Sequence, residues 1–146
     1  MLIICAVDGS TTSMVALERA NRLASWLDAV LEVVYVSHLP PIVLAAAEHA
    51  PLQLDELGEV DRREVWRAVD ETLEEQPQTR GGITKVDLEG YPPDVIAEYS
   101  EKHEADLVVV GSRGRGALAS LVLGSTSQRL LHLTPCDVLI VKGGQE

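Results

Sequence analysis

Apolar positions along most of this chain follow two different periods, which alternate with each other. Short, nearly continuous apolar runs are rich in valine, isoleucine and leucine and are typical of buried strands. Between them, apolar residues recur at the three- and four-residue spacing of an amphipathic helix. The alternation predicts strands at residues 2–8, 31–36, 83–88, 107–110 and 138–141.

The predicted helices fill most of the connections. The first spans residues 11–27, and Asp28 should end it, because aspartate tolerates a left-handed turn. A second spans 58–75, with Val60, Val65, Val69 and Leu73 facing inward. Two more follow the turn at residues 90–94 and the cluster 124–127, where Ser125, Thr126 and Ser127 are candidate caps. We expect residues 37–57 to form a loop with one short helical piece.

Strands that alternate with helices predict an α/β fold, a single doubly wound parallel sheet of five strands with helices on both faces. The favoured strand order is 3-2-1-4-5, and the alternative places strand two outermost. In either order the chain reverses direction after strand one, and ligands bind at the carboxyl ends of the strands at such a reversal. In order 3-2-1-4-5 those strands end at Asp8 and Gly111. The length predicts one domain over residues 1–146.

Composition narrows the possible functions. The formal charge of −11 argues against nucleic-acid binding, which needs a cationic face. No apolar run reaches membrane-spanning length, and the start lacks the basic residues of a signal peptide, so we expect a cytoplasmic protein without membrane contact. Cys5 and Cys136 are expected to be buried free thiols. The four histidines show no metal-ligand spacing and are expected at the surface: His38, His49, His103 and His132.

The candidate chemistry lies after the fourth strand. Gly111-Ser112-Arg113-Gly114 follows that strand, and Gly124-Ser125-Thr126-Ser127 begins nine residues after Gly114. Glycine allows positive φ and lets a backbone approach a ligand closely, and the start of a helix favours an anion. These two segments therefore predict a phosphate site without a dedicated lysine.

Three residues near this site have two possible interpretations each. Asp8 is either an acceptor for ribose hydroxyls or a nucleotide-bound metal, or a cap of the next helix. Val36 either holds the edge of a base or belongs to the core. Arg113 either contacts phosphates or is a solvated loop residue.

Two other nucleotide motifs are excluded or disfavoured. Residues 114–119 match the dinucleotide pattern G-x-G-x-x-A, but they do not follow the first strand, and the acidic residue Asp137 lies at the wrong end of the sheet. A Walker P-loop is absent from the sequence, because no Gly-Lys-Ser or Gly-Lys-Thr occurs.

The spacing from Gly111 to Gly124-Ser125 resembles the G-2x-G-9x-G-[S/T] signature of ATP-binding universal stress proteins. The resemblance extends to residues 6–10, 106–114 and 135–141, and Asp28 departs from it, because glycine is usual there. It implies a five-stranded fold that binds ATP, with or without Mg²⁺, although AMP and cyclic AMP share the adenosine half. It also implies a homodimer through Val138 to Val141, which would protect an apolar edge strand.

By position, the resemblance implies contacts from three groups of residues. Adenosine would be surrounded by Ala6, Val7, Asp8 and Val36. Ribose and the first phosphates would meet Val110, Gly111, Arg113 and Gly114, and the phosphate tail would meet Gly124, Ser125, Thr126 and Ser127. The expected role is nucleotide-dependent regulation in a stress response. Its rivals are a slow ATP hydrolase and a nucleotide-free interaction module of the same fold.

Overall fold

The computed structural model describes residues 1–38, 45–46, 48–49, 54–114 and 123–143. The strands are β1 (Leu2–Val7), β2 (Val30–Ser37), β3 (Ile83–Glu89), β4 (Leu107–Gly111) and β5 (Asp137–Val141). The helices are α1 (Thr11–Leu27), α3 (Leu54–Glu74), α4 (Pro92–Lys102) and α5 (Ser125–Leu133).

The sheet has five parallel strands in the order β3-β2-β1-β4-β5. The predicted α/β fold and its favoured strand order are confirmed, and the alternative with strand two outermost is wrong. The chain leaves β1 toward β2 and returns past it to β4, so the reversal lies between β1 and β4. Their carboxyl ends, at Val7 and Gly111, are therefore neighbours.

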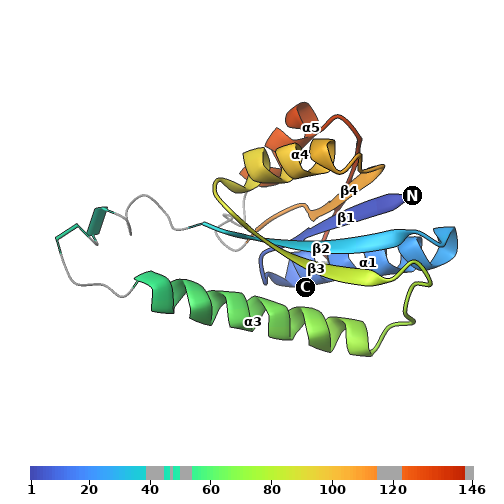
Figure 1. The fold of residues 1–146 in the computed structure, drawn as a ribbon, viewed down its shortest axis with the longest axis horizontal. Coiled ribbons are helices and arrows are strands. Elements are labelled where there is room, and N and C mark those ends of the chain that lie inside the picture. The colour runs from blue at the N-terminus through green and yellow to red at the C-terminus, as the bar shows by residue number, and fades with distance from the viewer. Residues whose placement is uncertain (39–44, 47, 50–53, 115–122, 144–146) are drawn as a thin grey trace.

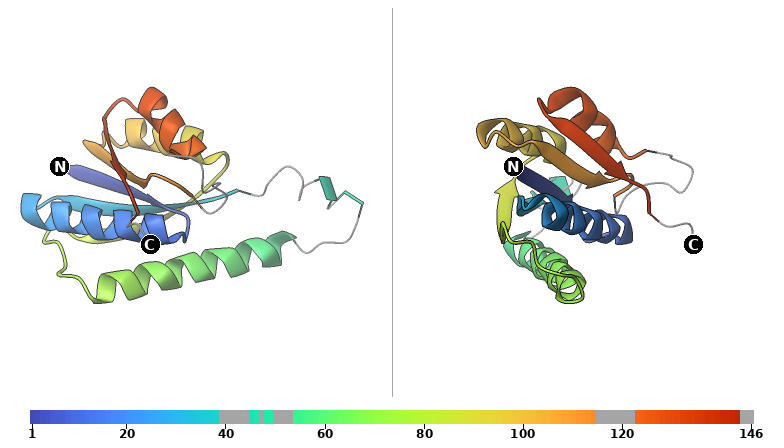
Figure 2. Two further views of the ribbon diagram at one scale, coloured as in Figure 1. Left: turned by 180° about the vertical axis from the view of Figure 1, so that it is seen from behind. Right: turned by 90° about the vertical axis from the view of Figure 1, so that its right-hand side faces the viewer.

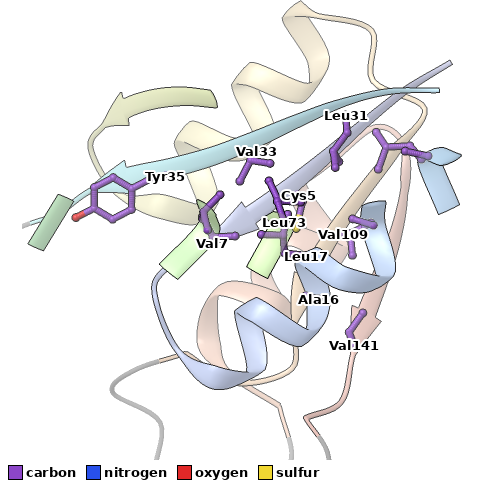
Figure 3. Packing of buried hydrophobic residues seen from close by; sticks show 14 of the residues in the cluster. Cys5, Val7, Ala16, Leu17, Leu31, Val33, Tyr35, Leu73, Val109 and Val141 are labelled. Carbon is purple, nitrogen blue, oxygen red and sulfur yellow. The ribbon is translucent and has the colours of Figure 1, made fainter. Parts of the chain in front are cut away.

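Helices cover both faces of the sheet (Figure 1), with α4 and α5 on one side and α1 and α3 on the other. The turned views agree with this layering (Figure 2). Alternate residues of β1 enter different cores, because successive side chains of a strand point to opposite faces. Cys5 and Val7 pack with Leu17 and Val33 under α1 and α3 (Figure 3). On the other face, Ala6 packs in the cluster under α4 and α5.

The first helix ends as the sequence predicts. Asp28 has φ 49° and ψ 38°, and its N–H donates to the carbonyl of Ala24. A short polar side chain makes this left-handed conformation accessible, so aspartate can stand where the resemblance implies glycine.

The third helix differs from its prediction at the start. It begins at Leu54 and runs through Gly58, where we expected it to begin. One glycine inside a helix costs only about 1 kcal/mol, so it need not mark a boundary. Val60 was predicted to face inward, but it is 54% exposed, because the start of α3 lies beyond the end of the sheet (Figure 1). Most of the predicted loop at 37–57 lies outside the described residues.

The histidines and the cysteines differ in how far their burial follows the prediction. All four histidines are exposed, as predicted. Cys5 is buried, but Cys136 is only partly buried and precedes β5, so its predicted burial is wrong in part. Within the described residues, no helix combines the length and the apolar character that crossing a bilayer requires.

Candidate functional site

The turn between β1 and α1 is closed by its own polar side chains. The Asp8 carboxylate accepts the backbone N–H of Ser10 at 2.9 Å, and Gly9 adopts φ 82°, which favours glycine. Ser10, not Asp8, caps α1, because its hydroxyl oxygen accepts the N–H of Ser13 at 3.2 Å. The cap interpretation of Asp8 is therefore wrong, and its carboxylate orders the turn that leads to the cap.

The end of β4 packs directly on the start of α1. A β-carbon at Gly111 would lie 2.9 Å from Thr12 Cγ2 and 3.2 Å from the Ser13 nitrogen. Real β-carbons essentially never come so close to their neighbours, so only glycine fits here without a shift. Gly111 is thus required by packing between two elements of the protein itself.

Hydrogen bonds tie α5 to the ends of β4 and β5. The buried hydroxyl of Ser127 donates to the Gly111 carbonyl at 2.6 Å. Ser112 donates its N–H to the Val141 carbonyl at 2.8 Å and accepts the Gly124 N–H at 2.6 Å. These bonds fix the start of α5 beside the carboxyl ends of both strands.

The residue at the N-cap of α5 differs from the sequence prediction. Gly124 is the capping residue and makes no side-chain cap, so Ser125, Thr126 and Ser127 belong to the first turn instead of capping it. Ser125 is exposed and Thr126 is half-buried. Free N–H groups at the start of a helix favour an anion, and the N-cap residue of α5 offers no side chain to compete for them.

The two segments that were predicted to converge are in contact. A β-carbon at Gly114 would lie 2.7 Å from Asp8 Oδ2, although the two residues are far apart in the sequence. A β-carbon at Gly124 would lie 3.4 Å from Arg113 Cα. Asp8, Gly111, Arg113, Gly114, Gly124 and Ser127 are therefore gathered at one edge of the sheet.

The role predicted for the signature glycines needs correction. Among the glycines in the described part of the chain, positive φ occurs at Gly9, Gly82 and Gly90, and not at Gly111, Gly114 or Gly124. A β-carbon at these positions would instead come close to Thr12, Asp8 or residues 112–113, within 2.7–3.4 Å. Sequence patterns register a glycine, but they do not show which neighbour excludes a side chain.

The remaining predicted residues lie in the sheet below this edge. Ala6 and Val110 are neighbours in register and are buried on the α4 and α5 face, whereas Val7 is buried on the other face. Val36 is half-buried, pairs with Leu88 and packs at the margin of the α4 and α5 core. The side chains of Ala6, Val7 and Val110 fill the core, so these residues can face the carboxyl edge only through their main chains. Val36 lies at the margin of the core.

Four polar residues of this edge were not among the predicted site residues. Ser10, Thr12, Ser13 and Ser112 position the β1–α1 turn and the start of α5. The sequence Gly9-Ser10-Thr11-Thr12-Ser13 contains several residues that could cap the next helix, and the structure shows that Ser10 does so. In the described ranges, no group of three histidine, cysteine, aspartate or glutamate side chains could hold a metal ion by itself.

Comparison with known proteins identifies the family. The model of the universal stress protein family matches residues 1–142. The chain belongs to the universal stress protein family. Universal stress protein MJ0531 of Methanocaldococcus jannaschii is 34% identical over 140 residues, covering 96% of this chain and 81% of that protein.

Solved structures share the fold. Universal stress protein UspA from Lactobacillus plantarum has a TM-score of 0.78 at 22% identity, with 97% of each chain covered. A universal stress protein in complex with cAMP has a TM-score of 0.65 at 25% identity, covering 99% of this chain and 98% of that one. A family member from Arabidopsis thaliana with AMP bound has a TM-score of 0.66 at 18% identity, covering 99% and 92%. Similar folds in this family thus include proteins that hold adenine nucleotides.

Proposed function

We propose that this universal stress protein binds an adenine nucleotide at the carboxyl edge between β1 and β4, and that ATP is its main ligand. The contact between Asp8 and Gly114 is the observation that carries the proposal, because it joins both halves of the predicted site. The cAMP and AMP complexes of similar fold support the choice of adenine.

The residues present fit the chemistry of a nucleotide. The Asp8 carboxylate is an acceptor of the kind that ribose hydroxyls need, and beside phosphates it can also serve as an oxygen ligand of Mg²⁺. The uncapped start of α5 suits phosphate oxygens, with Ser125 and Thr126 as further donors and Arg113 at its border. Val36 would meet the base at the end of β2.

The proposed role is regulatory and cytoplasmic. Two copies would pair through Val138 to Val141 of β5, an outer strand of the sheet. Ser112 joins the candidate site to this strand, because it donates to the carbonyl of Val141. A single hydrogen bond, from Ser112 to Val141, would therefore connect the nucleotide site to the proposed dimer interface.

Identification of the bound molecule tests the proposal directly. The purified protein is denatured, and any released nucleotide is identified by chromatography and mass. Release of ATP, AMP or cyclic AMP in near-stoichiometric amount is expected. A protein that releases none and binds none of the three in calorimetry would contradict the proposal, and release of ADP in excess would favour the hydrolase.

A double-mutant cycle tests the contact itself. Asp8→Ala removes a charge-assisted acceptor worth roughly 1.5–3 kcal/mol, so nucleotide affinity should fall by about 10- to 100-fold. Gly114→Ala places a methyl group against the Asp8 carboxylate and should lower affinity by a similar factor. Because both changes act on one contact, the double variant should lose less than the sum of the two losses.

Gly58→Ala is the matched control, because a β-carbon there meets nothing within 4 Å. Its nucleotide affinity should equal that of the unmodified protein. Strict additivity in the cycle, measured by calorimetry, would show that Asp8 and Gly114 act on the nucleotide separately.

A further inference from the structure

A groove of about 390 Å³ lies between α1 and β5, away from the contact between Asp8 and Gly114. Among the described residues, its lining comes from α1, from β5 and from the residue that follows β5. The lining residues are Arg19, Arg22, Leu23, Trp26, Leu139, Ile140, Val141 and Lys142.

The floor of the groove is apolar and open to solvent. Val141 is buried in the core under α1, and Leu139, two residues earlier, points to the same face. Leu139 is not part of that core and is 36% exposed. Trp26 at the end of α1 is 73% exposed. Exposed tryptophan is unusual on a protein surface and is enriched at the centres of binding interfaces.

The rim of the groove is cationic. Arg19, Arg22 and Lys142 are exposed and line it together. Elsewhere in the described ranges, basic residues of α3, β3 and α5 form ion pairs with acidic neighbours. The three rim cations have no such partner among the described residues. On a chain with a formal charge of −11, the groove is therefore a local reversal of sign.

This charge pattern selects among possible occupants. An acidic partner is repelled by the molecule as a whole and attracted here, which gives both orientation and specificity. A second copy placed on the groove by a two-fold axis would face its own Arg19, Arg22 and Lys142, because a two-fold interface brings the same patch from both copies together. Like charges would then oppose the contact.

We propose that the groove between α1 and β5 binds an extended acidic peptide segment of a partner protein, with an apolar side chain seated against Trp26 and Leu139. Carboxylates of the segment would pair with Arg19, Arg22 and Lys142. None of the lining residues is a predicted nucleotide-binding residue, and the groove uses the side chains of β5 on the α1 face, so the outer main chain of β5 stays available.

The test uses a short synthetic peptide that alternates glutamate with valine, and the Trp66→Phe variant, in which Trp26 is the remaining tryptophan of the sequence. Titration should shift the Trp26 emission to shorter wavelength, with a dissociation constant on the order of 100 μM at low salt. Added salt should weaken binding, since exposed charges are screened. A peptide with lysine in place of glutamate, or serine in place of valine, should not bind measurably.

Two charge-removing variants make the result decisive. Arg19→Gln with Arg22→Gln should weaken binding by about tenfold or more, because two charge-assisted contacts to the peptide are lost. Arg63→Gln with Arg67→Gln removes the same charge from exposed positions on α3 and should leave binding unchanged.

Three outcomes would overturn the proposal. The glutamate–valine peptide does not bind, or the lysine peptide binds as well, or the α3 variant loses as much affinity as the α1 variant. A change of oligomeric state in the Arg19 and Arg22 variant, seen by light scattering, would assign the groove to contact between copies instead.

Discussion

β3 and β5 are the two outer strands of one sheet, and their exposed sides carry different side chains. β3 alternates half-buried apolar residues with exposed polar ones, including Lys85 and Asp87. Both reach α3. Arg62 donates to Asp87 through Nε and Nη2, each at 2.8 Å, Trp66 donates to the same carboxylate at 3.0 Å, and Lys85 pairs with Asp70.

Among the described residues, no ion pair or side-chain hydrogen bond of this kind holds β5. Four of its five residues are apolar, and Leu139 is exposed beside Trp26. Charged side chains on an outer strand discourage pairing with another chain, and an apolar outer strand invites it. The comparison supports the proposal that another chain pairs with β5, because the charged side chains of β3 discourage such pairing and β5 lacks them.

A charge placed on β5 should have the largest effect on this comparison. Leu139→Lys puts an ammonium group among Arg19, Arg22 and Lys142 and onto the outer strand. If copies pair through β5, the molecular mass by light scattering should fall about twofold, from dimer to monomer.

Thr84→Lys is the matched control, because Thr84 is exposed on the other outer strand. It should leave the oligomeric state unchanged. Equal effects of the two substitutions, or an intact dimer in Leu139→Lys, would remove the proposed difference between the edges.

The network on β3 should contribute less. Asp87→Asn removes the ionic partner of Arg62 and leaves an amide that cannot accept both of its N–H groups. Exposed ion pairs are worth little, so the melting temperature should fall by only about 2 °C. Asp94→Asn, which removes a single contact to Arg129 at 3.1 Å, should change it less.

The same substitution predicts a pH dependence. The hydrogen bond from Arg62 lowers the pKa of Asp87 below its ordinary value, against the smaller opposing effect of burial. A lowered carboxyl pKa stabilises the fold above the ordinary value of about 4, and this stabilisation is lost as the pH falls through the folded value. Melting curves of Asp87→Asn should therefore approach those of the unmodified protein in acid, and a constant difference at every pH would contradict the assignment.

Much of the fold was predictable because apolar period and strand position are linked. The continuous runs at β1 and β4 marked strands buried on both faces, and the alternation at 83–88 marked an outer strand. Asp28 was recognisable as a helix end because few residues accept its dihedral angles. Val60 was misplaced because a pattern shows which side of a helix is apolar, but not where the sheet beneath it ends.

The sequence predicts which segments form the candidate site. It predicts less well what each residue of those segments contacts. The topology brought Asp8 to Gly114, which the strand order implies. The neighbours of each glycine depend on distances of a few tenths of an ångström, which no spacing encodes. Ser127 is the clearest example, because the sequence offers three adjacent hydroxyls and only its hydroxyl is buried against Gly111.

The smallest expected effect concerns the two thiols. Cys5 lies in the middle of the sheet, and burial raises its pKa to about 12, so at pH 8 almost none of it is the reactive thiolate. Cys136 is half-buried just before β5, and its pKa is raised mainly by burial. A thiol reagent should therefore label one cysteine in the native protein and both in denaturant.

If a partner covers β5, Cys136 should react faster in Leu139→Lys than in the unmodified protein, by less than about tenfold, since only access changes. Equal rates, with Leu139→Lys shown to be monomeric, would place the contact between copies away from the start of β5.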